Sequence, residues 1–358
     1  MSADQTPQNG GRILVDALRR QGVQRVWCVP GESYLPVLDA LYDGDIAVYN
    51  TRHEGSAANM AEAEGKLTGR PGICMVTRGP GATHAAIGVH TAFQDSTPMI
   101  LFIGQVARDA RDREGFQEVD YRAMFGPLAK WAAEIDDAAR IPEYVSRAFH
   151  VALSGRPGPV VLSLPEDMLS GEIVPPAQAP AAVAPACAPR GEDLQVLCDL
   201  LAAAQRPLLV VGGTGWGEAG LSGLAEFAQA NGLPVAASFR RQDLIDNRLD
   251  IYAGHLGLGV DPTLAERLKT ADLVVAIGSR LGENATGGYT LMTPPVPAQK
   301  LVHIHPDPNE IGRVYQSVLG LCCGLDEFGK ALRGLSVANA EKRAAWLAEA
   351  RAAYVKFS

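Results

Sequence analysis

Short apolar runs alternate with amphipathic stretches along the first 170 residues. In the stretch 12–22, Ile13, Leu14 and Leu18 fall on one stripe of a helix, and the apolar run that follows reads as a strand ending in a turn. The pattern predicts further helices at 35–44, 55–68, 82–96 and 141–154, and strands at 23–31, 46–50, 72–77, 98–104 and 155–168. Continuous apolar strands separated by helices are typical of a parallel sheet covered on both faces. We therefore expect residues 11–170 to form a doubly wound α/β domain.

The pattern changes after residue 170. Residues 171–190 are rich in Pro and Ala and have no usable period, which indicates an extended linker. Alternation resumes over 191–335, with strands expected at 207–213, 233–238, 272–279 and 300–307, and helices near 218–231 and at 261–270. This stretch predicts a second doubly wound, Rossmann-like domain. The polar residues 1–10 are expected to be a disordered tail, and 336–358 a helical tail that leads to a domain missing from the chain.

Composition and charge narrow the class of protein. The 358 residues include 32 basic and 40 acidic side chains, and the net charge of −8 disfavours nucleic acid and anionic membranes as partners. No apolar run approaches the ~20 residues that cross a bilayer, and the polar start is unlike a signal peptide. Six cysteines without CxxC spacing disfavour a metal site or a disulfide framework. A cytoplasmic protein with no metal site of its own fits these observations.

Three turns after predicted strands carry candidate chemistry, namely Pro30–Gly31, His53–Glu54 and the sequence TRGPGATH at 77–84. Since the carboxyl ends of parallel strands share one edge of a sheet, the three turns are expected to meet where doubly wound sheets bind ligands. The glycines of the third turn allow backbone amides to approach a ligand at a helix start. Each turn also has a plain structural alternative. A carboxylate at Glu54 favours the first turn of a helix through the helix dipole without any ligand.

The second domain contains a G-x-G-x-x-G pattern at Gly215–Gly220, directly after a predicted strand and followed by Asp243. This arrangement is the outline of a dinucleotide-binding turn, although glycine is frequent throughout the chain. The two histidines of HIHPD at 303–307 fall on one side of a predicted strand, with no third ligand nearby in the sequence. We interpret these histidines as structural, and we keep nucleotide binding at the glycine turn as an alternative.

Together these segments resemble the thiamine-diphosphate-dependent enzymes, and within that family the large, catalytic subunit of acetolactate synthase. The resemblance covers about residues 10–335 and is carried by VPGESYLPVLDAL, RHEGSAANMAE, GKLTGRPGICMVTRGPGATH, DSTPMILFIGQV, FQEVD, SGRPGPVVLSLPEDM and HIHPDPNEIG. It implies a first domain that binds the aminopyrimidine of thiamine diphosphate and a central domain that holds FAD in some members. It also implies 2-keto acid substrates, a homodimer or homotetramer with its active site between subunits, a regulatory subunit in some members, and a place in branched-chain amino acid biosynthesis.

By this resemblance, Glu54 is the glutamate that activates the cofactor through the ring nitrogen of its aminopyrimidine. The residues expected to shape the cofactor pocket are Pro30, Gly31, Thr77, Gly79 and Gly81. Phe116 and Gln117 are expected to border the neighbouring active site, with Gln117 in a catalytic role. The further cofactor-binding positions, which match FAD or nucleotide contacts, are Arg156, Gly213, Gly215, His255, Gly278, Arg280 and Asp307.

The chain departs from the family pattern in three ways. It contains no GDG motif with a downstream Asn, the signature that holds Mg²⁺ and the diphosphate, and it stops at Ser358, where that third domain is expected. Asn284 stands where acetolactate synthases usually carry Arg, which leaves FAD binding open. His84 replaces the Asn of the usual GPGATN turn, and Glu64 replaces a residue that is more often aromatic. We therefore expect a fragment, or a chain completed by a separate diphosphate-domain chain, that takes up Mg²⁺ only with the missing domain.

The function predicted from the sequence is thiamine-diphosphate-dependent decarboxylation of a 2-keto acid such as pyruvate, with carboligation to a second 2-keto acid. The chain by itself is expected to be catalytically incomplete. Two alternatives stay open. One is a 2-keto acid decarboxylase or another carboligase of the same superfamily, and the other is a non-catalytic nucleotide-binding module, which the glycines at Gly215–Gly220 favour.

Overall fold

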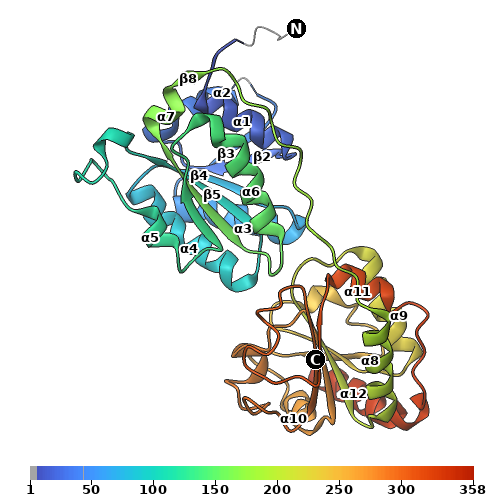
Figure 1. The fold of residues 1–358 in the computed structure, drawn as a ribbon. Helices are drawn as coiled ribbons and strands as arrows, with labels where there is room; N and C mark the ends of the chain where they lie inside the picture. Colours follow the sequence, from blue (N-terminus) through green and yellow to red (C-terminus); the bar gives the residue numbers. More distant parts are fainter. Residues whose placement is uncertain (1–5, 43) are drawn as a thin grey trace, which may run out of the picture. The chain divides into compact units, whose positions relative to one another are not determined.

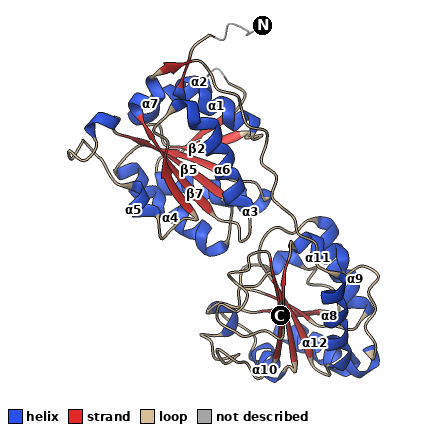
Figure 2. Cartoon of the chain, in the orientation of Figure 1, coloured by secondary structure: helices blue, strands red, loops and turns tan. Residues whose placement is uncertain are grey.

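A computed structural model describes residues 6–42 and 44–358 of the chain (Figure 1). The chain forms two compact units, Met1–Ala184 and Pro185–Ser358. Within the described residues, each unit contains a six-stranded sheet with helices around it (Figure 2). The division between the units falls inside the Pro- and Ala-rich stretch 171–190.

The sheet of the first unit is parallel throughout and has the strand order β3-β2-β4-β5-β7-β6. Its strands are β2 (Arg25–Cys28), β3 (Ala47–Asn50), β4 (Gly72–Val76), β5 (Met99–Gln105), β6 (Trp131–Glu134) and β7 (Pro159–Pro165). All except β6 coincide with strands predicted from apolar runs. The edge strand β6 was not predicted, because its sequence, WAAE, contains no continuous run of large apolar residues.

Helices cover both faces of this sheet (Figure 1). They are α1 (Gly10–Arg20), α2 (Leu35–Tyr42), α3 (Glu54–Thr68), α4 (Pro80–Asp95), α5 (Tyr121–Phe125), α6 (Ile141–Leu153) and α7 (Glu166–Ser170). One cluster of buried side chains joins α1, α2 and α6 to one face of the sheet, and another joins α3, α4 and α5 to the opposite face. This is the doubly wound arrangement expected from the alternating pattern.

Small residues allow α3 to pack closely on its neighbours. A Cβ placed on Gly88 of α4 would lie 2.4 Å from the Cβ of Ala58, and one on Gly65 of α3 would lie 2.1 Å from the carbonyl oxygen of Pro98. Both distances are well below van der Waals contact, so this approach requires glycine at the two positions. The close packing fixes where α3 begins, at the carboxyl edge of the sheet.

The sheet of the second unit is also parallel, with the order β11-β10-β9-β12-β13-β14. Its strands are β9 (Pro207–Val211), β10 (Val235–Ala237), β11 (Tyr252–His255), β12 (Leu273–Ile277), β13 (Lys300–His305) and β14 (Leu319–Cys322). The order reverses between β9 and β12, as it does in Rossmann folds. The second domain is therefore Rossmann-like, as expected, although the two short edge strands β11 and β14 do not stand out in the sequence.

The helices of this unit are α8 (Gly191–Ala203), α9 (Glu218–Ala230), α10 (Pro262–Thr270), α11 (Leu325–Ala331) and α12 (Ala344–Phe357). One cluster of buried side chains joins α8, α9 and α11 to the sheet, and another includes α10 and Ala350 of α12.

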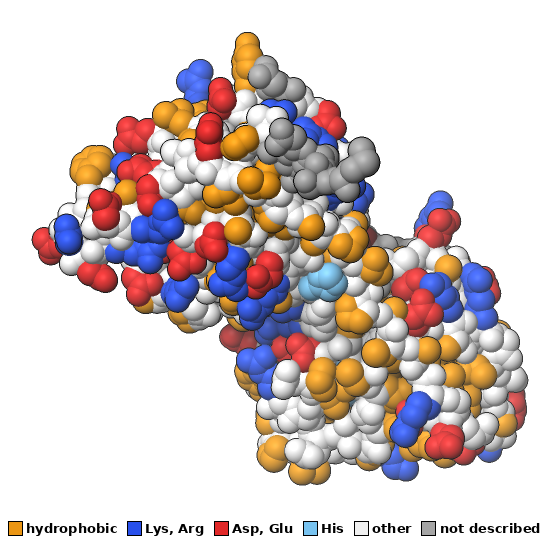
Figure 3. Space-filling view, turned by 45° about the horizontal axis from the view of Figure 1, so that its top comes forward, with side chains coloured by type: hydrophobic (Ala, Val, Ile, Leu, Met, Phe, Trp, Pro, Cys, Tyr) orange, Lys and Arg blue, Asp and Glu red, His pale blue; other side chains and the backbone are white. Residues whose placement is uncertain are grey.

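No helix in the described part of the chain has the length and apolar character needed to cross a membrane. On the face shown in Figure 3, acidic and basic side chains are interspersed.

The end of the predicted disordered tail is ordered, which corrects that expectation for residues 8–10. Gln8 and Asn9 form β1, which pairs antiparallel with β8 (Glu172–Ile173) at the start of the predicted linker. The side chain of Asn9 also accepts a hydrogen bond from the backbone amide of Arg12, at 2.9 Å, and so caps α1. Residues 1–5 of the predicted tail lie outside the described residues.

The C-terminal stretch 336–358, predicted as a helical tail, contains α12 and packs on the second unit. The indole nitrogen of Trp346 donates a hydrogen bond to the carbonyl oxygen of Pro207, at the start of β9. The side chain of Arg343 is completely buried and donates to the carbonyl oxygens of Leu201 and Asn231. The buried guanidinium thus has backbone acceptors, and the last helix is joined to β9, to α8 and to the end of α9.

Candidate functional site

Three turns meet at the carboxyl edge of the first sheet, where β3, β2 and β4 end side by side. The Oγ of Ser33 and the Oγ1 of Thr77 lie 2.8 Å apart and join the turn after β2 to the turn after β4. A Cβ on Gly31 would lie only 2.4 Å from the Cβ of Thr77, so the backbone of Gly31 lies against the Thr77 side chain and leaves no room for a larger residue. The sequence therefore located these neighbours correctly. Pro30, Gly31, Glu54, Thr77, Gly79 and Gly81 all belong to this edge.

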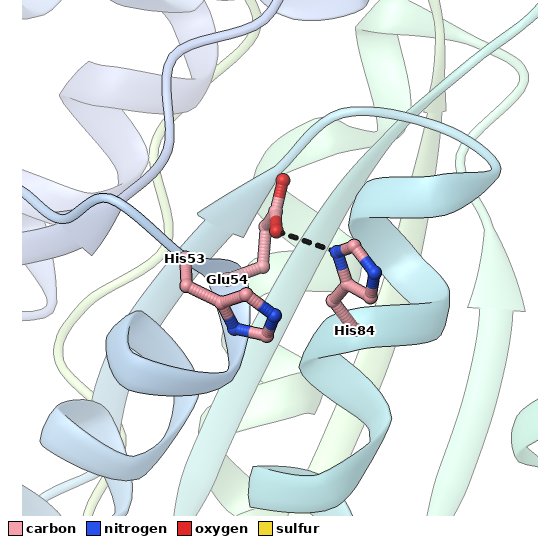
Figure 4. Close-up of side chains that lie close together, drawn as sticks. All are labelled: His53, Glu54 and His84. Carbon is pink, nitrogen blue, oxygen red and sulfur yellow. Dashed lines mark hydrogen bonds and ion pairs between the residues drawn. The ribbon is translucent and has the colours of Figure 1, made fainter.

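Glu54 is the first residue of α3, and its side chain is 14% exposed. The carboxylate does not cap the helix: the N-cap is His53, whose Nδ1 accepts the backbone amide of Gly55 at 3.0 Å. The Oε2 atom of Glu54 instead lies 2.9 Å from Nδ1 of His84 (Figure 4). Its other oxygen, Oε1, has no hydrogen-bond partner among the described residues. Glu54 thus lies in the first turn of α3, where the helix dipole favours a carboxylate, and one of its oxygens remains available.

His84 comes from the first turns of α4, and its side chain is half exposed. Its ring stacks on the ring of His53, with 4.6 Å between centroids and 27° between planes. Because Nδ1 of His84 faces a carboxylate oxygen, that nitrogen carries the hydrogen and donates it. His53 accepts at Nδ1, so a neutral His53 carries its proton on Nε2. His84 was noted in the sequence only as a departure from the family turn, and its contact with Glu54 could not be read there.

The cluster of His53, Glu54 and His84 has the residue types of a metal site, and its ligand atoms lie within 4.8 Å of one another. A metal ion binds imidazole in the plane of the ring, along the nitrogen lone pair. The two rings are stacked, which directs their lone pairs side by side and not toward a common point. Both Nδ1 atoms also have hydrogen-bond partners already. The arrangement fits a hydrogen-bonded carboxylate better than a metal centre.

A neutral, buried layer lies beneath Glu54. The hydroxyl of Tyr34 donates to the carbonyl oxygen of Val29 at 2.6 Å, and burial raises the pKa of this phenol. Burial also raises the pKa of the Cys28 thiol to about 11, and it raises the pKa of Cys74. These groups stay uncharged at neutral pH, so they add no charge that competes with the carboxylate of Glu54.

Phe116 and Gln117 reach the same edge from the charged connection between β5 and α5. A Cβ on Gly79 would lie 2.7 Å from the Cβ of Gln117, so these two residues are in contact. The backbone amide of Gly79 also donates to the hydroxyl of Tyr121 at 2.7 Å. The side chain of Phe116 is 71% exposed. The structure thus brings the predicted pair next to the glycine turn, with Phe116 facing outward.

In the second unit, the predicted cofactor positions lie at the carboxyl ends of four strands. Gly213 and Gly215 follow β9, His255 ends β11, Gly278 and Arg280 follow β12, and Asp307 follows β13. Arg156 is different, because it precedes β7 and lies at the amino edge of the first sheet. Its Nε donates to the Oγ of Ser96 at 2.8 Å and its guanidinium also contacts the carbonyl oxygen of Phe93. Arg156 is therefore away from Glu54 and is held within its own unit.

The glycine pattern at Gly215–Gly220 is occupied by the protein's own carboxylate. Oδ1 of Asp326 accepts the backbone amides of Gly217 and Gly220, at 3.0 and 2.8 Å, where a dinucleotide fingerprint would place a phosphate. Burial raises the pKa of Asp326, but its ion pair with Lys330 and these two amides outweigh burial and lower the pKa below its usual value. The glycines serve the contact between α9 and α11, which argues against the phosphate-binding interpretation of this turn.

The histidines of β13 are buried and hydrogen-bonded to backbone groups. The Nε2 atom of His303 donates to the carbonyl oxygen of Ser279 at 2.9 Å, and Nδ1 of His305 accepts the amide of Asp307 at 3.0 Å. Burial lowers the pKa of both rings, that of His305 to about 4. Among the described residues, they belong to no group of three metal-ligating side chains.

Two known protein-family descriptions match the chain. The thiamine pyrophosphate enzyme N-terminal TPP binding domain matches residues 8–124, and the thiamine pyrophosphate enzyme central domain matches residues 194–332. The two matches together cover more than two thirds of the chain. They correspond to the first and the second compact unit.

The chain is also similar to curated acetolactate synthases. It is 34% identical over 314 residues to the probable acetolactate synthase large subunit of Methanocaldococcus jannaschii, covering 85% of this chain and 52% of the relative. It is 33% identical over 328 residues to the acetolactate synthase isozyme 2 large subunit of Escherichia coli, covering 91% of this chain and 59% of the relative. The acetolactate synthase of Arthrospira platensis is 33% identical over 316 residues, with 85% and 54% covered. The chain spans little more than half the length of these relatives.

Proposed function

Since the chain belongs to the thiamine pyrophosphate enzymes and contains their N-terminal and central domains, we propose that it supplies the pyrimidine-binding half of an acetolactate synthase-like active site. The reaction removes CO₂ from a 2-keto acid such as pyruvate and joins the remaining two-carbon unit to the carbonyl carbon of a second 2-keto acid. When bound, thiamine diphosphate supplies the electron sink for the pair left by departing CO₂. The relatives named as acetolactate synthases support this reaction class.

The observation that carries the proposal is the carboxylate of Glu54. Its Oε2 is held by His84, while Oε1 is free of partners among the described residues. A Cβ on Gly81 would lie 3.6 Å from Oε1, so glycine at that position leaves open the approach to this oxygen. A ring nitrogen that shares a proton with a carboxylate is a suitable partner for this oxygen. The residues present are thus suited to the aminopyrimidine of thiamine diphosphate.

Each residue of the edge has a separate part in this proposal. Glu54 shares a proton with the ring nitrogen through Oε1, and His84 holds Oε2 so that the carboxylate keeps its orientation. Gly79 and Gly81 keep the turn free of side chains where the ring enters. Gln117 and Phe116 border the substrate side, because they lie beside Gly79 at the rim.

Further cofactors and partners follow from the family and remain proposals. FAD is proposed to contact the carboxyl edge of the second sheet near Gly213, Gly278 and Arg280, and its diphosphate would not use the amides at Gly217 and Gly220, which Asp326 already holds. We propose that Mg²⁺ binds only with a diphosphate-binding domain supplied by a longer chain or a separate one. A homodimer or homotetramer in the cytoplasm is proposed, and the exposed apolar side chains of α3 and α4 at Met60, Leu67 and Ile87 support self-association. A regulatory subunit is a further proposed partner.

Product analysis tests the proposed reaction. The assembled enzyme, meaning this chain completed by the diphosphate-binding domain that the family implies, is expected to convert pyruvate into acetolactate with release of CO₂. Acetaldehyde without acetolactate would show a simple decarboxylase instead. Isothermal titration tests the alternative of a nucleotide-binding module. Tight binding of ADP or FAD, with no turnover after a diphosphate-binding domain is added, would support that alternative.

Replacing His84 tests its part in holding Glu54. In the assembled enzyme we expect His84→Ala to lower turnover about tenfold, because an unheld carboxylate samples other rotamers. An amide donates hydrogen bonds too, so His84→Asn should recover part of the loss. The free energy of unfolding should change by less than about 1 kcal/mol, because the pair is partly exposed. His90→Asn, an exposed change on the same helix, is the control, and equal turnover in His84→Ala and this control would refute the assigned part.

A further inference from the structure

Arg78 belongs to the TRGPGATH turn of the candidate site, although it was not among the predicted site residues. It stands between Thr77 and Gly79 in the turn after β4, and its side chain is only 9% exposed. Its Nε donates to the carbonyl oxygen of Phe116 at 3.1 Å. Its Nη1 lies 3.0 Å from Oε2 of Glu166, and its Nη2 lies 3.3 Å from Oε1 of Glu32. One buried guanidinium therefore uses all three of its nitrogens.

The three partners come from three different segments of the first unit. Glu32 follows β2, Glu166 is the first residue of α7 after β7, and Phe116 belongs to the connection between β5 and α5. The two carboxylates remain partly hydrated, with 66% and 42% of their side chains exposed, while the guanidinium is shielded. A guanidinium spreads its N–H groups over three nitrogens in one plane, so it can reach acceptors that lie far apart, whereas a lysine ammonium donates from one nitrogen only.

The segment that Arg78 holds has an uncommon backbone. Gln117 has a φ of +65°, in the left-handed region that side-chain-bearing residues rarely adopt, so surrounding contacts must maintain it. The next residue of the turn, Gly79, packs against Gln117 so closely that a Cβ would lie 2.7 Å from the Cβ of Gln117. The amide of Gly79 also donates to the hydroxyl of Tyr121, which lies beyond the segment. Residues 78 and 79 thus contact residues 116 and 117 directly and hold them in place.

We propose that Arg78 is a positioning residue that, with Glu32 and Glu166, holds Phe116 and Gln117 at the substrate side of the site. This proposal rests on the proposed function, since it gives the held side chains a task in 2-keto acid binding. Among the described residues, no hydrogen bond or ion pair joins Arg78 to Glu54. Activation of the cofactor by Glu54 and positioning of the substrate side by Arg78 are therefore separable.

The first measurement follows the segment itself and needs only this chain. Arg113 is exposed in the connection that leads to Phe116, so trypsin cleavage after Arg113 reports how often the segment opens. Arg78→Lys keeps the charge and adds no new trypsin site, and we expect cleavage after Arg113 to become several-fold faster. Glu166→Gln, which changes a partly exposed partner, should give a smaller increase. Arg122→Lys, an exposed change on α5, should cleave at the wild-type rate.

The second measurement uses the assembled enzyme. We expect Arg78→Lys to raise KM for the 2-keto acid about tenfold, because Phe116 and Gln117 lose their fixed place. Exchange of the cofactor's C2 proton for deuterium should stay at the wild-type rate, since that step depends on Glu54. A purely structural defect would lower exchange and turnover together.

Each outcome decides the proposal. Unchanged cleavage in both Arg78→Lys and Glu166→Gln would overturn it, and so would faster cleavage with an unchanged KM. Slower C2 exchange in step with turnover would also overturn it, because Arg78 would then act on cofactor activation. If Arg78→Lys does not fold, Glu166→Gln carries both measurements. A wild-type assembled enzyme with no 2-keto acid turnover would contradict the proposed function, while the cleavage rates would still decide whether Arg78 holds the segment.

Discussion

Glu54→Gln is expected to lower turnover of the assembled enzyme by about a thousandfold, within the range that general acid–base groups contribute. The corresponding loss of transition-state stabilisation is about 4 kcal/mol. The physical reason is that an amide accepts and donates hydrogen bonds but cannot share a proton with a ring nitrogen at neutral pH. The variant keeps the size of the side chain and can still bond to His84, so the free energy of unfolding should stay within about 1 kcal/mol.

The measurement is steady-state turnover together with deuterium exchange at the C2 carbon of thiamine diphosphate, and both are expected to fall. A matched control is Glu64→Gln on the same helix. Glu64 accepts a hydrogen bond from the indole nitrogen of Trp27 at 2.7 Å and pairs with Arg25, away from the carboxyl edge. Near-normal exchange in Glu54→Gln would refute the proposal that Glu54 activates the cofactor. A loss of exchange in Glu64→Gln of similar size would point to a general defect of α3.

Lowering the pH from 6.5 toward 4 should destabilise the second unit by about 3 kcal/mol through His305 alone. Burial, with His303 as a second cause, lowers the pKa of His305 from the ordinary 6.5 to about 4. Between these values the unfolded chain binds a proton on His305 and the folded chain does not. The contribution of His305 to the free energy of unfolding is therefore fully present above pH 6.5 and is lost as the pH falls from 6.5 to about 4. His303, whose pKa burial also lowers, adds to the loss in the same direction.

Denaturant unfolding at pH 7 and at pH 4.5 measures this loss, and the comparison with His305→Asn isolates the histidine from carboxylates that titrate in the same range. Asparagine offers an oxygen to the amide of Asp307 in place of Nδ1, so the variant should fold and lose stability less steeply. His150→Asn, an exposed change in the first unit, should follow the wild-type profile. An equally steep loss in His305→Asn would contradict the assignment.

Two doubly wound domains and most of their elements were predictable from the sequence, because periodicity reports which residues a helix or strand buries. The central strands β4, β5, β7, β9 and β12 are buried on both faces, and their apolar runs are continuous. The edge strands β6, β11 and β14 were not predictable in this way. They are short, and each is a strand because a neighbour pairs with it.

The glycine turn of the second unit shows the limit of a local pattern. Gly217 and Gly220 have the spacing of a dinucleotide fingerprint, but the carboxylate of Asp326, more than a hundred residues along the chain, binds their amides. The same holds for the C-terminal stretch, which reads as a tail. Trp346 and Arg343 connect it to β9 and to the ends of other elements. In both cases the partner lies far away in the sequence.

For the candidate site, the sequence by itself determined that Glu54 stands where a strand passes into a helix, beside two glycine turns, because the alternation of elements fixes which turns share a sheet edge. The tertiary structure alone decided that His53 caps the helix, that His84 holds the carboxylate, and that Arg78 binds three separate segments. The hydrophobic periodicity of the sequence shows only which residues share one face of a single helix or strand. Contacts between side chains of different elements depend on the order of the strands and on how closely small residues let the helices approach.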